Sequence, residues 1–152
     1  SRTISINLKG TQKIGYSGGS ASGSGVNMVK YVSYMDPFSK RHHEETFPLI
    51  KQNFIDSGKI DYVFKHFTRN QVDQVVSLNV ECVAEQWKLL EITDKLFANQ
   101  NGLGNSTMIR ELVGQLNINM VQFDSCVNSN KYGSKVLADF EEGRIKGVSG
   151  TP

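Results

Sequence analysis

The side chains best able to do chemistry gather in residues 36–48, which read DPFSKRHHEETFP. Asp followed by Pro is a strong signal for a helix start, because the Asp side chain can cap free N–H groups and Pro fits the first helical turn. Asp36 would therefore stand at a helix N-terminus, with Ser39 one turn further on. A hydrolase or a metal enzyme could combine Asp36 with four further polar residues of this stretch: His42, His43, Glu44 and Glu45.

The spacing of these residues argues against both kinds of enzyme. Adjacent helical residues point about 100° apart, so His42 and His43 cannot easily chelate one ion. A helical metal site needs an i, i+4 pair, which His42 and Thr46 do not supply. Ser39 stands in no elbow-like motif of the kind that exposes a nucleophilic serine. We therefore expect packed or partly exposed histidines, with no metal and no cofactor, and we interpret His66 in the same way.

The chain has two cysteines, Cys82 and Cys126. They stand too far apart in the sequence for the Cys-x-x-Cys spacing of a redox dithiol or a zinc site. From the residues alone, two interpretations remain open. Both cysteines are buried free thiols, or they form one structural disulfide, which would indicate an oxidising compartment.

Four segments alternate apolar with polar residues and are rich in β-branched or aromatic side chains, which predicts strands. They cover residues 3–9, 11–16, 26–34 and 59–67. The first two form a hairpin with 11–16 at the sheet edge, and 26–34 is expected to be a central strand. Residues 17–25 contain only Ser, Gly and one Ala, a composition typical of a flexible linker.

Helical spacing of apolar residues dominates the rest of the chain. Residues 37–56 should form one helix, kinked at Pro48, with an apolar stripe of Phe47, Ile50 and Phe54. Further helical segments are predicted at residues 71–99, 106–116, 119–128 and 132–146. We interpret three aromatic residues of these segments as core: Trp87, Phe97 and Phe123.

Composition and charge narrow the class of protein. With 152 residues, 38% of them hydrophobic and 21% charged, the chain has the make-up of a single globular domain. A net charge of +2 gives no reason to expect a nucleic acid or an anionic membrane as partner. No apolar run approaches the roughly 18 residues of a membrane span, and no secretory signal stretch opens the chain.

Residues 36–48 resemble the active-site helix of the DsbA-like thiol–disulfide oxidoreductases in the thioredoxin superfamily. In that family a strand is followed by Cys-Pro-x-Cys, one or two basic residues and a run such as His-Glu-Glu-Thr-Phe-Pro. Further matches follow in family order at residues 60–67, 81–86, 94–97, 123–126, 131–132, 142–144 and 147–152. The resemblance covers roughly residues 26–152.

This resemblance implies an α/β (α+β) thioredoxin-like fold with a mixed sheet and an inserted helical subdomain, here residues 70–146. It implies a structural disulfide between Cys82 and Cys126, because many relatives carry cysteines at both places. The parent family acts outside the cytoplasm, in the periplasm or as secreted protein. Its groove for extended polypeptide substrates would be lined here by four residues: Pro37, Phe38, Thr151 and the cis-proline, Pro152.

The redox dithiol of the family is missing. Aligned on His-Glu-Glu-Thr-Phe-Pro, the first cysteine falls on Asp36 and the second on Ser39. The family needs its first thiol as a thiolate, which the helix N-terminus stabilises. Asp36 keeps a negative charge at this place and Ser39 keeps a hydroxyl, so these substitutions preserve the fold and remove the redox step.

The resemblance also suggests a circular permutation. In the family a β-hairpin follows the cis-proline, and residues 3–16 look like that hairpin moved to the N-terminus. Residues 17–25 would then tie the former last strand to the former first one, since nine residues can span about 30 Å and a strand is roughly 20 Å long. A linker this loose allows a monomer or a strand-swapped dimer. The alternative is an unpermuted protein with a natural Ser/Gly loop.

Three hypotheses about function follow. The first is a redox-inactive relative of the oxidoreductases that still binds extended polypeptide near Asp36. The alternative is an engineered binding module or scaffold without catalysis. The third is the hydrolase or metal enzyme considered at the outset.

Overall fold

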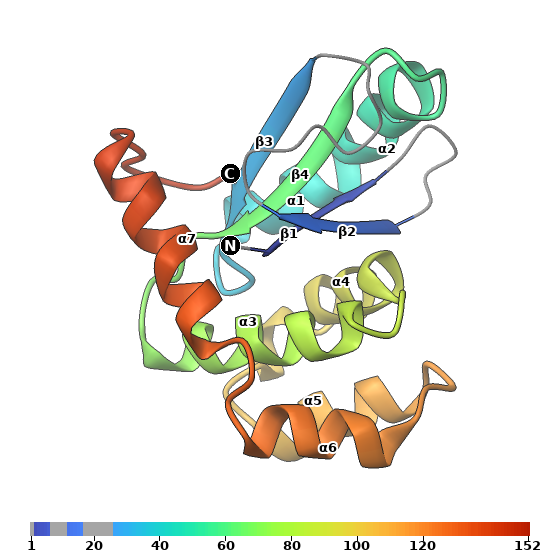
Figure 1. Cartoon of the computed structure of the whole chain (residues 1–152), viewed down its shortest axis with the longest axis vertical. Coiled ribbons are helices and arrows are strands. Elements are labelled where there is room, and N and C mark those ends of the chain that lie inside the picture. The colour runs from blue at the N-terminus through green and yellow to red at the C-terminus, as the bar shows by residue number, and fades with distance from the viewer. Residues whose placement is uncertain (1, 7–11, 17–25) are drawn as a thin grey trace.

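The computed structural model describes residues 2–6, 12–16 and 26–152. Within these residues the sheet has four strands, β1 (Arg2–Ile6), β2 (Gln12–Tyr16), β3 (Asn27–Val32) and β4 (Asp61–His66), in the order β2-β1-β4-β3 (Figure 1). β3 runs parallel to β4, whereas β1 runs antiparallel to both β4 and β2, so the sheet is mixed. The predicted hairpin turn and the predicted linker at 17–25 lie outside the described residues.

The prediction that residues 26–34 form a central strand is wrong for the described sheet, in which β4 is central and β3 stands at the end. β4 pairs on one side with β3, from Asn27 opposite Asp61 to Val32 opposite His66, and on the other side with β1. Burial follows this order. All but one residue of β4 is buried, while the first three residues of β3 are exposed.

The helical run after β3 combines α1 (Pro37–Arg41), the π-helical η1 (His42–Thr46), α2 (Phe47–Ile50) and the π-helical η2 (Lys51–Ile55). Pro48 has no N–H to donate to the preceding turn, and wider π turns flank it on both sides. These turns shift the predicted apolar stripe. Phe47 faces the core, but Ile55 is fully buried in place of Phe54, which is 45% exposed.

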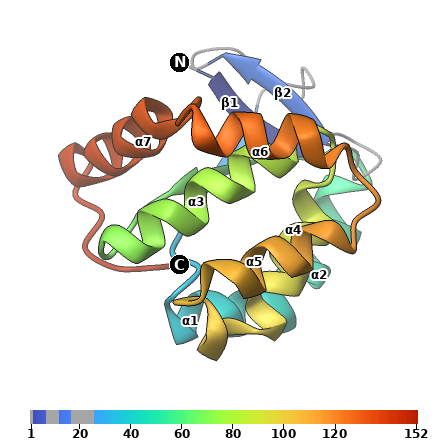
Figure 2. The same cartoon turned by 90° about the horizontal axis from the view of Figure 1, so that it is seen from below.

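Five α-helices pack below and beside the sheet in Figure 1. They are α3 (Gln71–Ala84), α4 (Leu89–Ala98), α5 (Ser106–Gly114), α6 (Met120–Asn128) and α7 (Gly133–Ile145), with a short 3-10 turn, η3 (Gln100–Gly102), after α4. Figure 2 shows α3 in the middle of this layer, where it contacts α4, α6 and α7. None of the helices in the described part is long and apolar enough to cross a membrane.

The helical segment predicted over residues 71–99 is broken between α3 and α4. Trp87 takes a left-handed backbone conformation with φ of 66°, and its side chain is 56% exposed. Its predicted place in the core is therefore wrong, because the turn that ends α3 directs the ring outward. Phe97 and Phe123 are buried as predicted.

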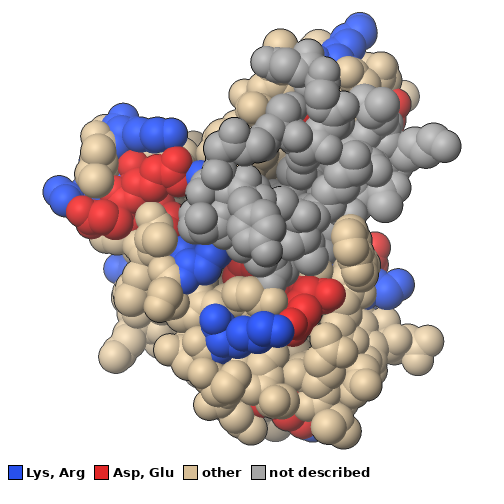
Figure 3. Space-filling view, viewed as in Figure 1, with Lys and Arg blue, Asp and Glu red and all other residues tan. Residues whose placement is uncertain are grey.

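Charged side chains of both signs lie next to each other on the face shown in Figure 3. Two neighbouring ion pairs at the C-terminal end of α7 illustrate this arrangement, Arg144 with Glu141 and the C-cap residue Lys146 with Glu142.

Candidate functional site

Asp36 stands at the N-cap of α1 and is only 6% exposed. Its Oδ2 accepts three hydrogen bonds, from the Ser39 backbone N–H at 3.0 Å, from the Ser39 hydroxyl at 3.2 Å and from the Thr151 hydroxyl at 2.8 Å. Pro37 occupies the first position of α1, where a missing N–H costs nothing. A buried carboxylate is thus held by three donors at the start of the helical run.

A residue near the other end of the sequence also contacts Asp36. Thr151 donates to Asp36 across 115 positions of sequence, and the Thr151–Pro152 peptide bond is cis. A guanidinium nitrogen of Arg69 lies 3.7 Å from Oδ1 of Asp36. Asp36, Arg69 and Thr151 border a cavity of about 260 Å³ together with Phe38, whose side chain is 68% exposed. Of the six residues predicted for this region, Asp36, Ser39 and Thr151 are joined by hydrogen bonds, and Pro37, Phe38 and Pro152 are their neighbours in the chain.

Ser39 links the site to the interior. It is 1% exposed, and its Oγ also accepts the backbone N–H of Ser33 at 3.4 Å. The Ser33 hydroxyl donates in turn to Asp73 at 2.6 Å, and Asp73 accepts the backbone N–H of Arg69. Burial raises the pKa of Asp73, although these hydrogen bonds oppose the rise. Beside the cavity, the described residues offer the Asp36 carboxylate, hydroxyls and a guanidinium, and no thiol.

A family model described as "Thioredoxin" matches residues 19–152. The chain belongs to the thioredoxin family. The matched residues include Asp36, Ser39, Thr151 and Pro152, and they leave β1 and β2 outside the match.

Two curated relatives in sequence carry provisional names as protein-disulfide oxidoreductases. A protein of Rickettsia typhi, provisionally named a protein-disulfide oxidoreductase, is 28% identical over 120 residues, which are 76% of this chain and 44% of that protein. A relative from Rickettsia prowazekii with the same provisional name matches equally well, at 28% identity. The chain thus spans less than half the length of these curated relatives.

Solved structures share the thioredoxin-like fold. Wolbachia pipientis α-DsbA1 superposes with a TM-score of 0.76 and 20% identity, over 99% of this chain and 72% of that one. Oxidised BdbD from Bacillus subtilis superposes with a TM-score of 0.75 and 19% identity, over 88% of this chain and 76% of that one. The thioredoxin-like α/β fold predicted from the sequence is confirmed.

The polar residues of a supposed hydrolase or metal site do not converge in this thioredoxin fold. His43 is buried, stacks on Phe47 and contacts Asp94 at 2.6 Å through Nε2. His42 instead contacts the Tyr62 hydroxyl at 3.3 Å. Glu44 and Glu45 pair with basic residues one turn earlier on the helix surface. Each side chain has its own partner, so the geometry offers no shared ligand site.

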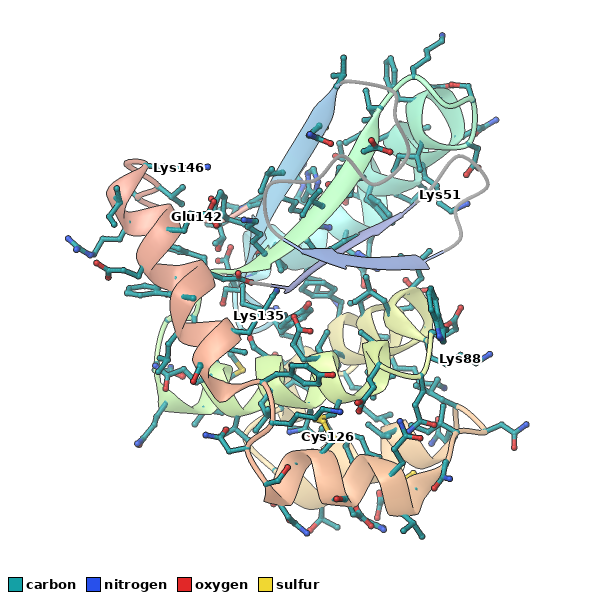
Figure 4. The ribbon with its side chains drawn as sticks, viewed as in Figure 1. Lys51, Lys88, Cys126, Lys135, Glu142 and Lys146 are labelled. Atoms are coloured by element: carbon teal, nitrogen blue, oxygen red, sulfur yellow. A yellow bond between two sulfur atoms is a disulfide. The ribbon has the colours of Figure 1, made fainter. Side chains whose placement is uncertain are left out.

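Sequence reasoning missed a cluster of charges buried between β4, α3 and α7. Lys135, which is labelled in Figure 4, donates to Glu81 at 2.7 Å and to Asp139 at 2.6 Å. His66 contacts Glu81 at 2.8 Å. Burial alone would raise the pKa of Glu81, but Lys135 and His66 lower it to about 2. The three possible metal ligands His66, Glu81 and Asp139 lie close together, but the Lys135 ammonium already stands between the two carboxylates. In the sequence, only the i, i+4 spacing of Lys135 and Asp139 could have indicated an ion pair of this cluster.

Cys82 of α3 and Cys126 of α6 form a disulfide, visible as the yellow bond beside the Cys126 label in Figure 4. Both cysteines are buried, at 0% and 3% exposure. The bond joins two helices of the layer below the sheet and lies away from the cavity beside Asp36. No other cysteine exists in the sequence.

Proposed function

We propose that this thioredoxin-family chain is a redox-inactive relative of the DsbA-like protein-disulfide oxidoreductases and that it binds extended polypeptide without covalent exchange. One observation carries the proposal. Asp36 and Ser39 occupy the helix start beside Thr151 and cis-Pro152, while both cysteines are joined elsewhere. Disulfide exchange needs a thiolate that attacks a disulfide sulfur, and a carboxylate cannot form that mixed disulfide.

The chemistry of the cavity supports non-covalent binding. The exposed Phe38 ring offers an apolar contact, and Arg69 offers donors that a peptide carbonyl or carboxylate can accept. Oδ2 of Asp36 already accepts three hydrogen bonds from hydroxyl and backbone donors, so its role is to hold the Thr151 segment against the helix. We also infer an oxidising, extracytoplasmic compartment, because a buried disulfide such as Cys82–Cys126 persists there.

A disulfide-exchange assay tests the proposal. We expect this chain not to accelerate the reduction of insulin by dithiothreitol, and the double variant Asp36→Cys/Ser39→Cys to accelerate it. The matched control is Glu141→Cys/Arg144→Cys, which places the same Cys-x-x-Cys spacing on exposed positions near the end of α7. Activity of the unchanged chain, or equal activity of the two double variants, would overturn the proposal.

The circular permutation and the domain boundaries stay predictions, and the sheet order does not favour the permutation. Pro152 lines a cavity together with Met28 and Val29 of β3, so a strand continuing from Pro152 would meet β3 first. β1 instead pairs with β4, about 10 Å from β3 at the usual strand spacing. A rearranged chain with residues 3–16 placed after Pro152 decides the matter. If the protein is permuted, as the engineered-scaffold alternative also requires, the rearranged chain should be at least as stable in urea as the present one.

A further inference from the structure

Lys30 of β3 is a buried lysine, and no carboxylate of the described residues contacts its amine. Its side chain turns toward the helical run and is 5% exposed. Nζ lies over the rings of Phe64, Phe47 and Tyr62, at 4.4, 4.7 and 5.6 Å from their centroids. Among the described residues Nζ has no hydrogen-bond partner. An amine enclosed by aromatic rings loses its hydration and gains only the weaker attraction of their faces.

The charged groups around Lys30 do not compensate for the lost hydration of its amine. Burial lowers the pKa of Lys30 to about 7, and Asp94 on α4 raises it only in part. The Asp94 carboxylate is already engaged by His43 of η1 at 2.6 Å. His42 of η1 carries a lowered pKa, chiefly through burial and also through Lys30. Near neutral pH, much of the Lys30 amine therefore has a free lone pair.

A cavity of about 270 Å³ adjoins this lysine. Its lining includes Lys30, the His42 and Tyr62 side-chain pair, and the C-terminal residue Pro152. His42 Nε2 lies 3.3 Å from the Tyr62 hydroxyl, so a proton donor and an acceptor stand together at this cavity. A desolvated lysine beside a cavity with acid–base groups is the arrangement in which lysine serves as a nucleophile.

We propose that this cavity is a binding site for small uncharged aldehydes, which the Lys30 amine holds as an imine. The Nζ lone pair forms a bond to the carbonyl carbon while the carbonyl π electrons move to oxygen. The oxygen then leaves as water with the two amine protons, which Tyr62, His42 and solvent can relay. No oxidant or reductant is required. An uncharged partner fits because the rings that enclose Lys30 turn faces of negative electrostatic potential toward this site, and these faces disfavour an anion.

Reductive trapping with a model aldehyde tests this site. The protein is treated with benzaldehyde and sodium cyanoborohydride at pH 7, and benzylated lysines are quantified by peptide mass spectrometry. Lys59 is the reference because it is exposed. An ordinary lysine has a pKa near 10.4, so its neutral fraction at pH 7 is below that of Lys30 by about 10³-fold. Allowing for restricted access, we expect Lys30 to be labelled at least about tenfold faster than Lys59.

Two variants and a pH profile complete the test. Lys30→Met should abolish the fast labelling, whereas Lys59→Met should leave it intact. If Lys30→Met fails to fold, the unchanged protein still decides the question. Labelling of Lys30 should level off just above pH 7, whereas an ordinary exposed amine keeps gaining neutral form toward pH 10. Labelling of Lys30 no faster than that of Lys59, or only after addition of urea, would overturn the proposal.

Discussion

Lys30 and Lys135 are buried almost equally, at 5% and 7% exposure, yet their surroundings differ in kind. Lys135 stands between the carboxylates of Glu81 and Asp139, whereas Lys30 stands among three aromatic rings. Burial alone would lower the pKa of both amines. The two carboxylates raise the pKa of Lys135 above its usual value, while the pKa of Lys30 falls to about 7. The partner, and not the depth, decides whether a buried lysine is a fixed charge or a reactive amine.

The two lysines also lie at different interfaces of the fold. Lys135 ties α7 to α3 and, through Asp139 and the His66 backbone, to β4. It therefore holds the helical layer against the sheet. Within residues 2–6, 12–16 and 26–152, Lys30 joins no such network, and it lies between the sheet and the helical run that follows it. The first lysine is a structural element, and the second is available for chemistry.

Removal of the paired lysine should have the largest effect. Lys135→Met leaves Glu81 and Asp139 buried without their cation, and breaking a buried ion pair in this way costs about 3–5 kcal/mol of unfolding free energy. Urea unfolding followed by circular dichroism measures the loss. A loss below about 1 kcal/mol would show that water or His66 can replace the ammonium, and the contrast with Lys30 would fail.

Lys30 should make the free energy of unfolding depend on pH. The folded pKa of Lys30, about 7, lies below its unfolded value, so the unfolded state binds more protons between these two pKa values. The free energy of unfolding should therefore rise from pH 7 to pH 9, by about 2 kcal/mol after allowance for structural relaxation. Lys30→Met should remove this rise, and Lys59→Met should retain it. An unchanged slope in Lys30→Met would mean that other groups cause it.

Sequence patterns correctly predicted those features, such as helix starts and strands, that depend on neighbouring residues. Asp-Pro at residues 36–37 predicted the capped helix start, and alternating residues predicted β1, β2 and β4. The resemblance extended this to the thioredoxin-like fold and brought Thr151 and Pro152 to Asp36. These features depend on capping, strand propensity and a family pattern, all of which can be read along the chain.

Features that depend on packing across the fold could not be read in this way. The end position of β3 follows from which strand β1 pairs with, and a strand pattern does not name its partner. The π turns around Pro48 changed which side of the helical run is buried, and the turn at Trp87 exposed a ring that hydrophobicity alone assigned to the core. Lys30 and Lys135 look alike in the sequence, because their partners come from distant elements.

Asp36 offers an intermediate case, a buried carboxylate held by neutral donors and a distant guanidinium. Thr151→Val removes the shortest of its hydrogen bonds, 2.8 Å, and keeps the size of the side chain. A hydrogen bond to a charged group contributes about 1.5–3 kcal/mol when it is buried, and Thr151 is partly exposed, so we expect a loss of about 1–2 kcal/mol in urea unfolding. Thr107→Val, at an exposed position of α5, is the control and should change little. Equal effects of the two variants would mean that Thr151 does not hold Asp36.

The smallest effect is expected at an ion pair on the surface. Arg110 donates to both oxygens of Asp124, at 3.1 and 2.8 Å, and this contact raises the pKa of Arg110 and lowers that of Asp124. Both groups stay hydrated when they separate, so Arg110→Met should leave the urea midpoint unchanged within error. This pair has two hydrogen bonds to one carboxylate, whereas Lys135 binds two carboxylates, and it is exposed where Lys135 is buried. If Arg110→Met destabilised the protein as much as Lys135→Met, the cost would come from losing any paired cation, and burial would no longer explain why Lys135 matters.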